Sequence, residues 1–180
     1  MATPQLSPDQ IAWLSDAVAQ YITAQRNRHA PRAAAIPAAA RTALRGFFTP
    51  TVLDTTHVLT LHDERVQNPD FYPALEALGF RNLPDQSAMG AITFSDIVVS
   101  HAPFDDGLLF HELVHAEQYR QLGIQRFSEL YVRGFLSGGC YERIPLEMHA
   151  YELGAQYEAN PQRVFSVEEA VGRRIVSLAY

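Results

Sequence analysis

Two histidines spaced four residues apart in an otherwise apolar stretch constrain the fold of this chain more than any other feature. The stretch runs Leu108-Leu109-Phe110-His111-Glu112-Leu113-Val114-His115. In an α-helix of about 3.6 residues per turn, positions i and i+4 lie on one face, so His111 and His115 would present their imidazoles side by side. Glu112 is about 100° further round the axis, so its carboxylate can reach the same region from one side. The pattern predicts a helix that brings two histidines and a glutamate together.

Helix start and stop signals surround this stretch. Asp105, Asp106 and Gly107 can cap a helix, and Gly123 can end it in the left-handed conformation, so we predict that the helix extends to about Leu122. Similar signals predict further helices over residues 124–136, 145–159 and 166–178. The last two are marked by Asn160-Pro161, which would end one helix, and by the capping box Ser166-Val167-Glu168-Glu169, which would begin the other.

The N-terminal half is expected to combine helices with a little β-structure. Ser7, Pro8 and Gln10 form a helix start signal, and apolar residues at helical spacing predict a helix over about residues 8–27. A connector rich in Ala and Pro spans residues 30–40, a short helix could follow at 41–48, and residues 51–61 indicate a weak strand. Residues 91–94 and 97–100 are rich in β-branched side chains and flank Ser95-Asp96, which predicts a tight hairpin. The expected fold class is α+β, mostly helical, with a small hairpin or sheet preceding the histidine helix.

Composition fits one globular domain and argues against two classes of partner. The chain has 180 residues, of which 47% are apolar and 19% charged, so residues 1–180 are interpreted as a single domain. The net charge of −6 and the lack of Lys or Arg runs argue against nucleic-acid and anionic-membrane partners. Cys140 is the only cysteine, which excludes an internal disulfide and a Cys-rich zinc site. Residues 1–7 lack a leader pattern and no segment approaches the ~20 apolar residues of a membrane span, so a cytoplasmic location is expected, with signal-independent export left open.

The two histidines suggest a catalytic zinc site, which usually takes three protein ligands and a water molecule. The extended motif with a third histidine is absent because Gln121 stands in that place, and no aspartate follows Asp106. Glu147 is the preferred third ligand because it lies on the first turn of a predicted helix that could cross the histidine helix, with the small Ala150 one turn further on. Glu152 is the alternative, since residues five apart cannot both face the ion equally well.

Three other downstream residues are weaker candidates. His149 points away from the face of Glu147 and is expected to be a surface or supporting residue. Cys140 lies beside two glycines and is expected to be a buried or incidental thiol. Glu117 faces away from His115 and is expected at the surface.

Together these residues resemble the gluzincin group of zinc metallopeptidases, in which a His-Glu-x-x-His helix is joined by a glutamate from a second helix. The resemblance implies a zincin-like fold with zinc as cofactor, His111, His115 and Glu147 as its ligands, and Glu112 as the base that activates water. The longer pattern, with Gln118-Tyr119 and then Pro145-Leu146-Glu147, is similar to largely uncharacterised bacterial domains, some of them linked to toxins or contractile injection systems. Many gluzincins carry an aspartate where Tyr151 stands here, so another residue must orient the histidines.

The expected function is zinc-dependent hydrolysis of peptide bonds in a peptide or protein substrate. Glu112 would assist the attack of a metal-bound water and return the proton to the leaving amine. The oxyanion needs a further donor, and the sequence leaves four candidates open: Tyr141, Tyr151, His149 and Arg133. A second hypothesis is a non-catalytic, metal-stabilised interaction module of a larger toxin or secretion assembly. The sequence carries no sign of the oligomeric state.

Overall fold

The computed structural model describes residues 4–178 and has a mostly helical α+β fold with one small sheet, which confirms the predicted fold class. Residues 1–3, which belong to the segment inspected for a leader, lie outside the described range. The α-helices are α1 (Pro8–His29), α2 (Ala38–Leu44), α3 (Pro50–Thr55), α4 (Tyr72–Ala77), α5 (Asp106–Gly138), α6 (Pro145–Ala159) and α7 (Val167–Leu178). The strands are β1 (Ala34–Ala35), β2 (His57–Thr60), β3 (Ala91–Phe94) and β4 (Ile97–Ser100), and two 3-10 helices are η1 (Ala30–Arg32) and η2 (Tyr141–Arg143).

The sheet is mixed and has the strand order β1-β2-β4-β3. β3 and β4 form the predicted antiparallel hairpin, with Ala91 opposite Ser100 and Phe94 opposite Ile97. Ser95 in the turn takes a positive φ of 63°, which a two-residue hairpin turn requires. β2 pairs with β4 in parallel, and β1 adds a two-residue antiparallel pairing to β2. This order leaves β3 at one edge of the sheet, paired only with β4.

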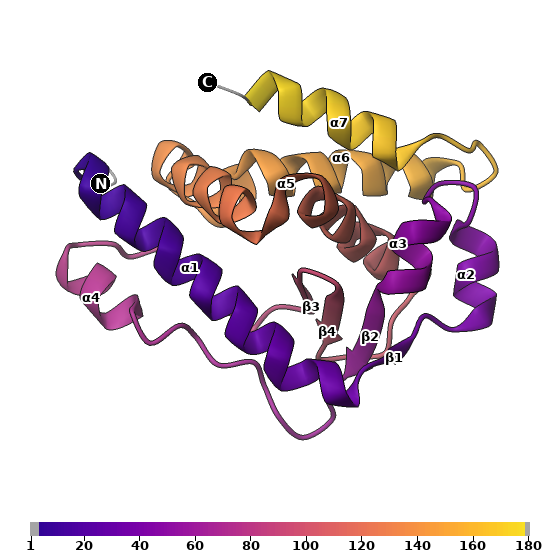
Figure 1. Cartoon of the computed structure of the whole chain (residues 1–180), viewed down its shortest axis with the longest axis horizontal. Coiled ribbons are helices and arrows are strands. Elements are labelled where there is room, and N and C mark those ends of the chain that lie inside the picture. The colour runs from indigo at the N-terminus through magenta and orange to yellow at the C-terminus, as the bar shows by residue number, and fades with distance from the viewer. Residues whose placement is uncertain (1–3, 179–180) are drawn as a thin grey trace.

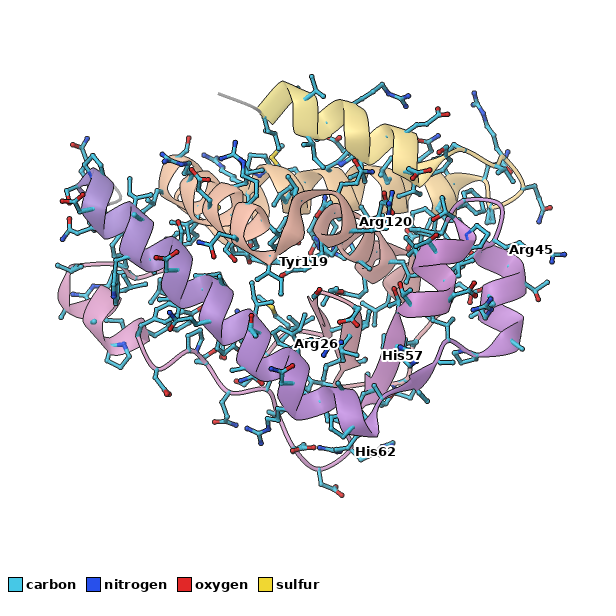
Figure 2. The ribbon with its side chains drawn as sticks, viewed as in Figure 1. Arg26, Arg45, His57, His62, Tyr119 and Arg120 are labelled. Atoms are coloured by element: carbon cyan, nitrogen blue, oxygen red, sulfur yellow. The ribbon has the colours of Figure 1, made fainter. Side chains whose placement is uncertain are left out.

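The long helices lie on one side of the sheet (Figure 1). α5 packs against α6, with α7 over both, and α1 crosses the hairpin and contacts α5. Arg26 of α1, labelled in Figure 2, anchors this crossing. Its Nε and Nη2 each donate to the carboxylate of Asp96 in the hairpin turn at 2.7 Å. Such a bidentate pair fixes orientation as well as distance. α1 therefore encloses the space between the hairpin and α5.

Gly123 divides α5 into two segments. Its φ of 72° and ψ of 163° are non-helical, so the backbone bends there although helical hydrogen bonding resumes at once. A Cβ at this position would meet nothing within 4 Å, so glycine is needed for the backbone conformation and not for space. The predicted end of the histidine helix near Leu122 and the predicted helix over 124–136 thus correspond to the two segments of α5. The second segment continues to Gly138.

The other predicted helices agree closely with the structure. α1 begins with a complete capping box, in which Ser7 Oγ accepts from Gln10 N and Gln10 Oε1 accepts from Ser7 N. It ends at His29, two residues later than predicted. α6 covers the predicted 145–159, and α7 starts one residue after Ser166, whose Oγ accepts from Glu169 N at 3.2 Å.

The region from residue 30 to residue 61 differs from the prediction. The connector contains η1, β1 and the start of α2, and α2 covers 38–44 where the short helix was expected at 41–48. The expected strand over 51–61 is half wrong, because α3 occupies 50–55 and only β2 (57–60) is extended. Thr49 caps α3 by accepting from Val52 N, and Pro50 stands at the first helical position, so the local start signal outweighs the β-propensity of the threonines. α4 was not predicted.

Two apolar clusters make up the core. One lies between α1, the hairpin and the second segment of α5, and the other joins the first segment of α5 to α2, α3, α6 and α7. The second cluster is centred on Phe110, which is fully buried and stacks on Tyr157 of α6 with ring centroids 4.4 Å apart. Phe110 precedes His111, so this packing fixes the histidine helix relative to α6. Within residues 4–178, no helix is both long enough and apolar enough to cross a bilayer.

Candidate metal centre

The candidate centre lies where α5 and α6 cross. The first segment of α5 supplies His111 and His115 from one face, as their four-residue spacing predicts, and Glu147 comes from the first turn of α6. Pro145 opens α6, and a carboxylate in the first turn suits the positive end of the helix dipole. The approach is close: a Cβ at Gly134 of α5 would come within 2.6 Å of Pro145 Cδ, so glycine is required at this crossing.

The three side chains point their ligand atoms at one another. His115 Nε2 lies 3.2 Å from His111 Nε2 and 3.2 Å from Glu147 Oε2, and His111 Nε2 lies 3.6 Å from Glu147 Oε2. Three donors bound tetrahedrally at 2.0–2.2 Å would be about 3.3–3.6 Å apart, so this triangle has the size of a zinc site. Two imidazoles and one carboxylate are also a donor set that catalytic zinc takes. The three side chains therefore fit a zinc ion both in the spacing and in the chemical type of their ligand atoms.

Gln118 supports the centre from behind. Its Oε1 faces His115 Nδ1 at 2.9 Å, and its Nε2 donates to the Leu146 carbonyl at 3.0 Å. The amide is fully buried, and in the neutral form of His115 that binds a metal, this contact favours the proton on Nδ1 and leaves the Nε2 lone pair directed at the cluster. Gln118 thus takes the orienting role that Tyr151 cannot. Sequence reasoning assigned no role to this residue, although it lies one turn after His115.

Glu112 lies beside the triangle without being part of it. Its carboxylate is buried, and Thr93 Oγ1 of β3 donates to Oε2 at 2.7 Å. The same hydroxyl lies 3.1 Å from the Glu112 carbonyl oxygen, so Thr93 contacts both the backbone and the side chain of Glu112. The edge strand therefore positions the carboxylate that the sequence predicted as the base. Thr93 carried no recognisable signal, because its contact depends on how the hairpin packs on α5.

Burial and mutual charge perturb the ionisable groups of the cluster. Burial raises the pKa of Glu112, against the opposing effect of the two histidines and Thr93. Burial alone would lower the pKa of His115, but the Glu147 carboxylate outweighs it and raises that pKa to about 9. Burial would likewise raise the pKa of Glu147, yet the charge of His115 and hydrogen bonds from the histidines and Tyr141 hold it well below its usual range. The cluster is thus arranged to stabilise positive charge next to Glu147.

The other proposed ligands lie elsewhere. Glu152, the alternative third ligand, is exposed and pairs with Arg174 of α7, with Nη2 to Oε2 at 3.1 Å. Cys140 is half-buried in the turn before η2. His149, expected to be a surface or supporting residue, is buried and is not part of the cluster, and burial lowers its pKa to about 4. Of the two candidate carboxylates on α6, Glu147 meets the histidines and Glu152 does not.

The geometry narrows the four candidates for the oxyanion donor. Tyr141 lines the groove together with His111 and Glu112, and it is one of the groups that hold the pKa of Glu147 low. Tyr151 is 52% exposed, with its ring 4.5 Å from that of His111. Arg133 instead pairs with Glu129 at 2.9 Å on the outside of α5, and His149 lines neither hollow beside the centre. The two tyrosines are the candidates that reach the site.

The expectation that Glu117 lies at the surface is wrong. Its side chain is 1% exposed and accepts bidentately from Arg120, with Nε to Oε2 at 2.8 Å and Nη2 to Oε1 at 2.7 Å. Arg120 also donates to Glu168 of α7 at 2.5 Å. The polar face of α5 that turns away from the histidines is therefore covered by α7, and Glu117 belongs to the contact between these helices.

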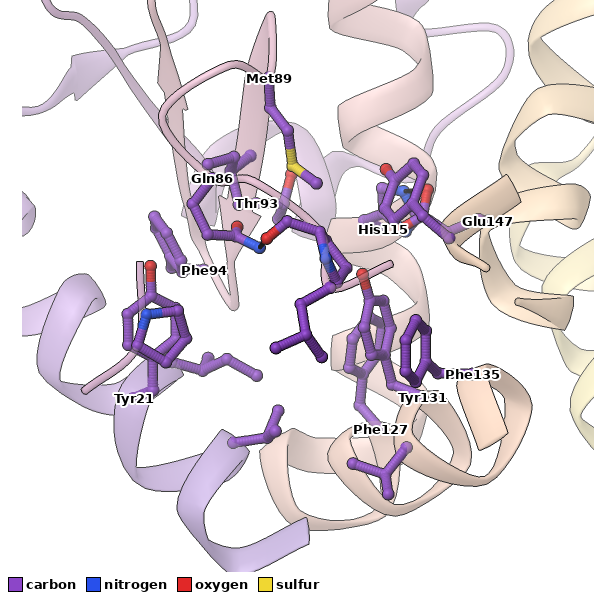
Figure 3. A pocket seen from close by; sticks show the side chains of 18 of the residues that line it. Tyr21, Gln86, Met89, Thr93, Phe94, His115, Phe127, Tyr131, Phe135 and Glu147 are labelled. Carbon is purple, nitrogen blue, oxygen red and sulfur yellow. Dashed lines mark hydrogen bonds and ion pairs between the residues drawn. The ribbon is translucent and has the colours of Figure 1, made fainter. Parts of the chain in front are cut away.

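The centre lies between two hollows, a groove on one side and a mostly apolar cavity on the other. The groove is lined by residues at the start of β3, in the first part of α5, in η2 and in α6, among them Ala91, His111, Glu112, Tyr141 and Tyr151. The cavity lies on the other side, between α1, the hairpin and the second segment of α5, and reaches Glu112, His115 and Glu147 (Figure 3). A substrate held in the groove would therefore lie beside His111 and Glu112.

Comparisons with protein families, with curated proteins and with solved structures found no match to this chain.

Proposed function

We propose that this protein is a zinc-dependent metallopeptidase of the gluzincin type. The observation that carries the proposal is the triangle of His111, His115 and Glu147 ligand atoms, with edges of 3.2, 3.2 and 3.6 Å, beside the separate buried carboxylate of Glu112. A ligand triad with an adjacent free carboxylate is the arrangement that metal-assisted hydrolysis needs. An ordinary buried ion pair would need neither the second histidine nor Glu112.

Glu112 would act as the general base and then as the general acid. Zinc, when bound, supplies a Lewis acid that polarises the scissile carbonyl and brings the pKa of a water molecule to about 7. Glu112 takes the proton from that water as the nucleophile attacks, and gives it to the leaving amine. Burial raises the pKa of Glu112, which favours the return of the proton. Thr93 keeps the carboxylate in place, because its hydroxyl donates to Oε2 at 2.7 Å.

The groove offers binding groups for an extended peptide. β3 is an edge strand, and its first residue, Ala91, lines the groove together with Gly90, which precedes it. An extended substrate can pair with the free edge of such a strand through its backbone. Tyr141 and Tyr151 line the same groove and are placed to donate to the oxyanion. These features support a peptide as substrate.

One observation favours a second candidate, a metal-stabilised interaction module without catalysis. The ligand atoms join α5 to α6 and two of the three side chains are buried, so a bound ion would also crosslink the core. Both candidates predict metal binding and loss of stability on chelation. They differ in Glu112, which only the peptidase requires.

Two measurements on the full chain test the proposal. Metal content by mass spectrometry should give about one zinc per chain in the wild type, retained in Glu152→Ala and lost in Glu147→Ala. The zinc-loaded protein should cleave a degenerate peptide library, and Glu112→Gln should abolish cleavage while keeping zinc and fold. A wild type that binds no zinc after reconstitution would refute both candidates. Zinc binding without cleavage of any peptide would leave the interaction module.

A further inference from the structure

His101 connects three segments of the chain at the end of β4. Its Nδ1 lies 2.6 Å from the Met89 carbonyl oxygen, its Nε2 accepts from Val66 N at 3.1 Å, and its own backbone N–H donates to the Gly90 carbonyl at 2.9 Å. Met89 and Gly90 come directly before β3, and Val66 lies in the loop between β2 and α4. This half-buried residue therefore attaches both loops to the sheet.

The two partners of the His101 imidazole allow only one hydrogen-bonding arrangement. A backbone carbonyl can only accept and a backbone N–H can only donate, so Nδ1 must carry a proton and Nε2 must offer its lone pair. A ring with protons on both nitrogens could not accept from Val66 N. The contacts therefore require the neutral Nδ1–H tautomer, in which both ring nitrogens are used to bridge Met89 and Val66.

The segment that His101 holds is part of the wall of the groove. Met89, Gly90 and Ala91 all line the groove. Because the backbone N–H of His101 donates to the Gly90 carbonyl, the backbone groups of Gly90 point towards β4. Backbone groups of successive residues in a strand point to opposite edges, so the N–H and C=O of Ala91 point to the free edge of β3. His101 thus determines the position of backbone groups with which an extended peptide can pair.

We infer that His101 is a positioning residue for substrate binding, which holds residues 89–91 so that the free backbone groups of Ala91 face the groove. The inference rests on the proposed peptidase function and adds a residue that determines how well the peptide is held. Thr93, two residues further along β3, positions the Glu112 carboxylate instead. The beginning of β3 therefore serves binding, and Thr93 serves the chemical step.

The kinetic test separates binding from the chemical step in the zinc-loaded protein. His101→Phe keeps a ring of similar size but makes neither side-chain hydrogen bond, so it should raise KM for a cleaved peptide about five- to tenfold, the effect of losing about one main-chain hydrogen bond to the peptide. Its kcat should stay within about twofold of the wild type, because the lost contact serves the ground state and the transition state alike. His101→Asn keeps a side-chain N–H near the position of Nδ1 and should restore KM to within about twofold. His62→Ala, at an exposed position in the loop after β2, is the matched control and should behave as wild type.

Two NMR measurements on the full chain do not depend on activity. A long-range ¹H–¹⁵N spectrum of the wild type at pH 8 should show His101 as the Nδ1–H tautomer. The Val66 amide, which donates to Nε2, should exchange with D₂O at least about tenfold faster in His101→Phe than in the wild type or in His62→Ala.

The possible failures are distinguishable. The Nε2–H tautomer, or a Val66 amide that exchanges equally fast in all variants, would overturn the inference. Cleavage by His101→Phe with an unchanged KM, or with a loss confined to kcat, would also overturn it while leaving the proposed peptidase function intact. Zinc-loaded wild-type protein that cleaves no peptide would overturn both.

Discussion

Replacing Gln118 by alanine should weaken zinc binding more than any other change outside the ligand set. The substitution removes the buried bridge between His115 Nδ1 and the Leu146 carbonyl, with lengths of 2.9 and 3.0 Å. Loss of a residue that orients a metal ligand typically costs 10- to 100-fold in metal affinity, which equals about 1.4–2.7 kcal/mol. The two lost hydrogen bonds should lower the stability of the metal-free protein by about 1–3 kcal/mol in addition.

Two measurements separate these effects. Zinc affinity is measured by competition with a chromophoric chelator, and the free energy of unfolding by urea titration in excess EDTA. Gln125→Ala is the matched control, since Gln125 lies on the same helix but its side chain donates to the exposed Asp16 carboxylate. Its zinc affinity and its free energy of unfolding should stay at wild-type values. Gln118→Glu keeps the acceptor for His115 but loses the donor to Leu146, so it should keep zinc affinity while losing stability. A Gln118→Ala protein that binds zinc within twofold of the wild type would refute the orienting role.

Three further predictions concern the base, the core and the response to pH. Thr93→Val removes the hydroxyl that donates to the Glu112 carboxylate, so it should lower kcat about tenfold or more with little change in KM. Thr93→Ser keeps the hydroxyl and should retain activity. Equal rates for the two variants would contradict the positioning role of Thr93. Phe110→Ala should lower the free energy of unfolding, measured with urea, by about 3–5 kcal/mol, because the fully buried ring stacks on Tyr157. A decrease below about 1 kcal/mol would show that this aromatic packing does not hold α5 to α6. His29 is buried with both ring nitrogens unpartnered, and burial and the charge of Arg28 lower its pKa, so the unfolded chain binds the proton more readily. The contribution of neutral His29 to the free energy of unfolding is fully present above about pH 6.5 and is lost as the pH falls below that value. The urea midpoint of His29→Phe should therefore fall less than that of the wild type between pH 7.5 and pH 5.5, and equal falls would exclude His29 as the cause.

Local signals in the sequence predicted most of the helices and the composition of the metal cluster. Helix ends depend on nearby residues such as Ser7, Gly123 and Pro145, so they can be predicted from the sequence without knowing the fold. The four-residue spacing of His111 and His115 likewise determines a shared helix face. Glu147 could be preferred over Glu152 because only one of them lies on the first turn of the crossing helix.

Features that depend on how distant segments pack could not be predicted in this way. Glu117 was misplaced because helix geometry shows that it faces away from His115, but not that α7 covers that face. Thr93 approaches Glu112 only because the hairpin packs on α5. The segment over 51–61 was partly wrong because β-branched threonines outweighed the Thr49-Pro50 start signal in the prediction, and the short α4 carries too few turns to show a periodicity.

The packing of α1 on α5 has a consequence for the order in which the protein is completed during synthesis. Residues 30–105 lie between the two helices, so α1 leaves the ribosome long before the surface that it covers exists. Contacts of such sequence separation form late, because the intervening chain must be ordered first. Glu147 follows later still, and until α6 is made the histidines lack their third partner. A nascent or truncated chain would therefore carry the histidine motif without the complete group of His111, His115 and Glu147, and the proposed metal centre could form only when nearly the whole protein is present.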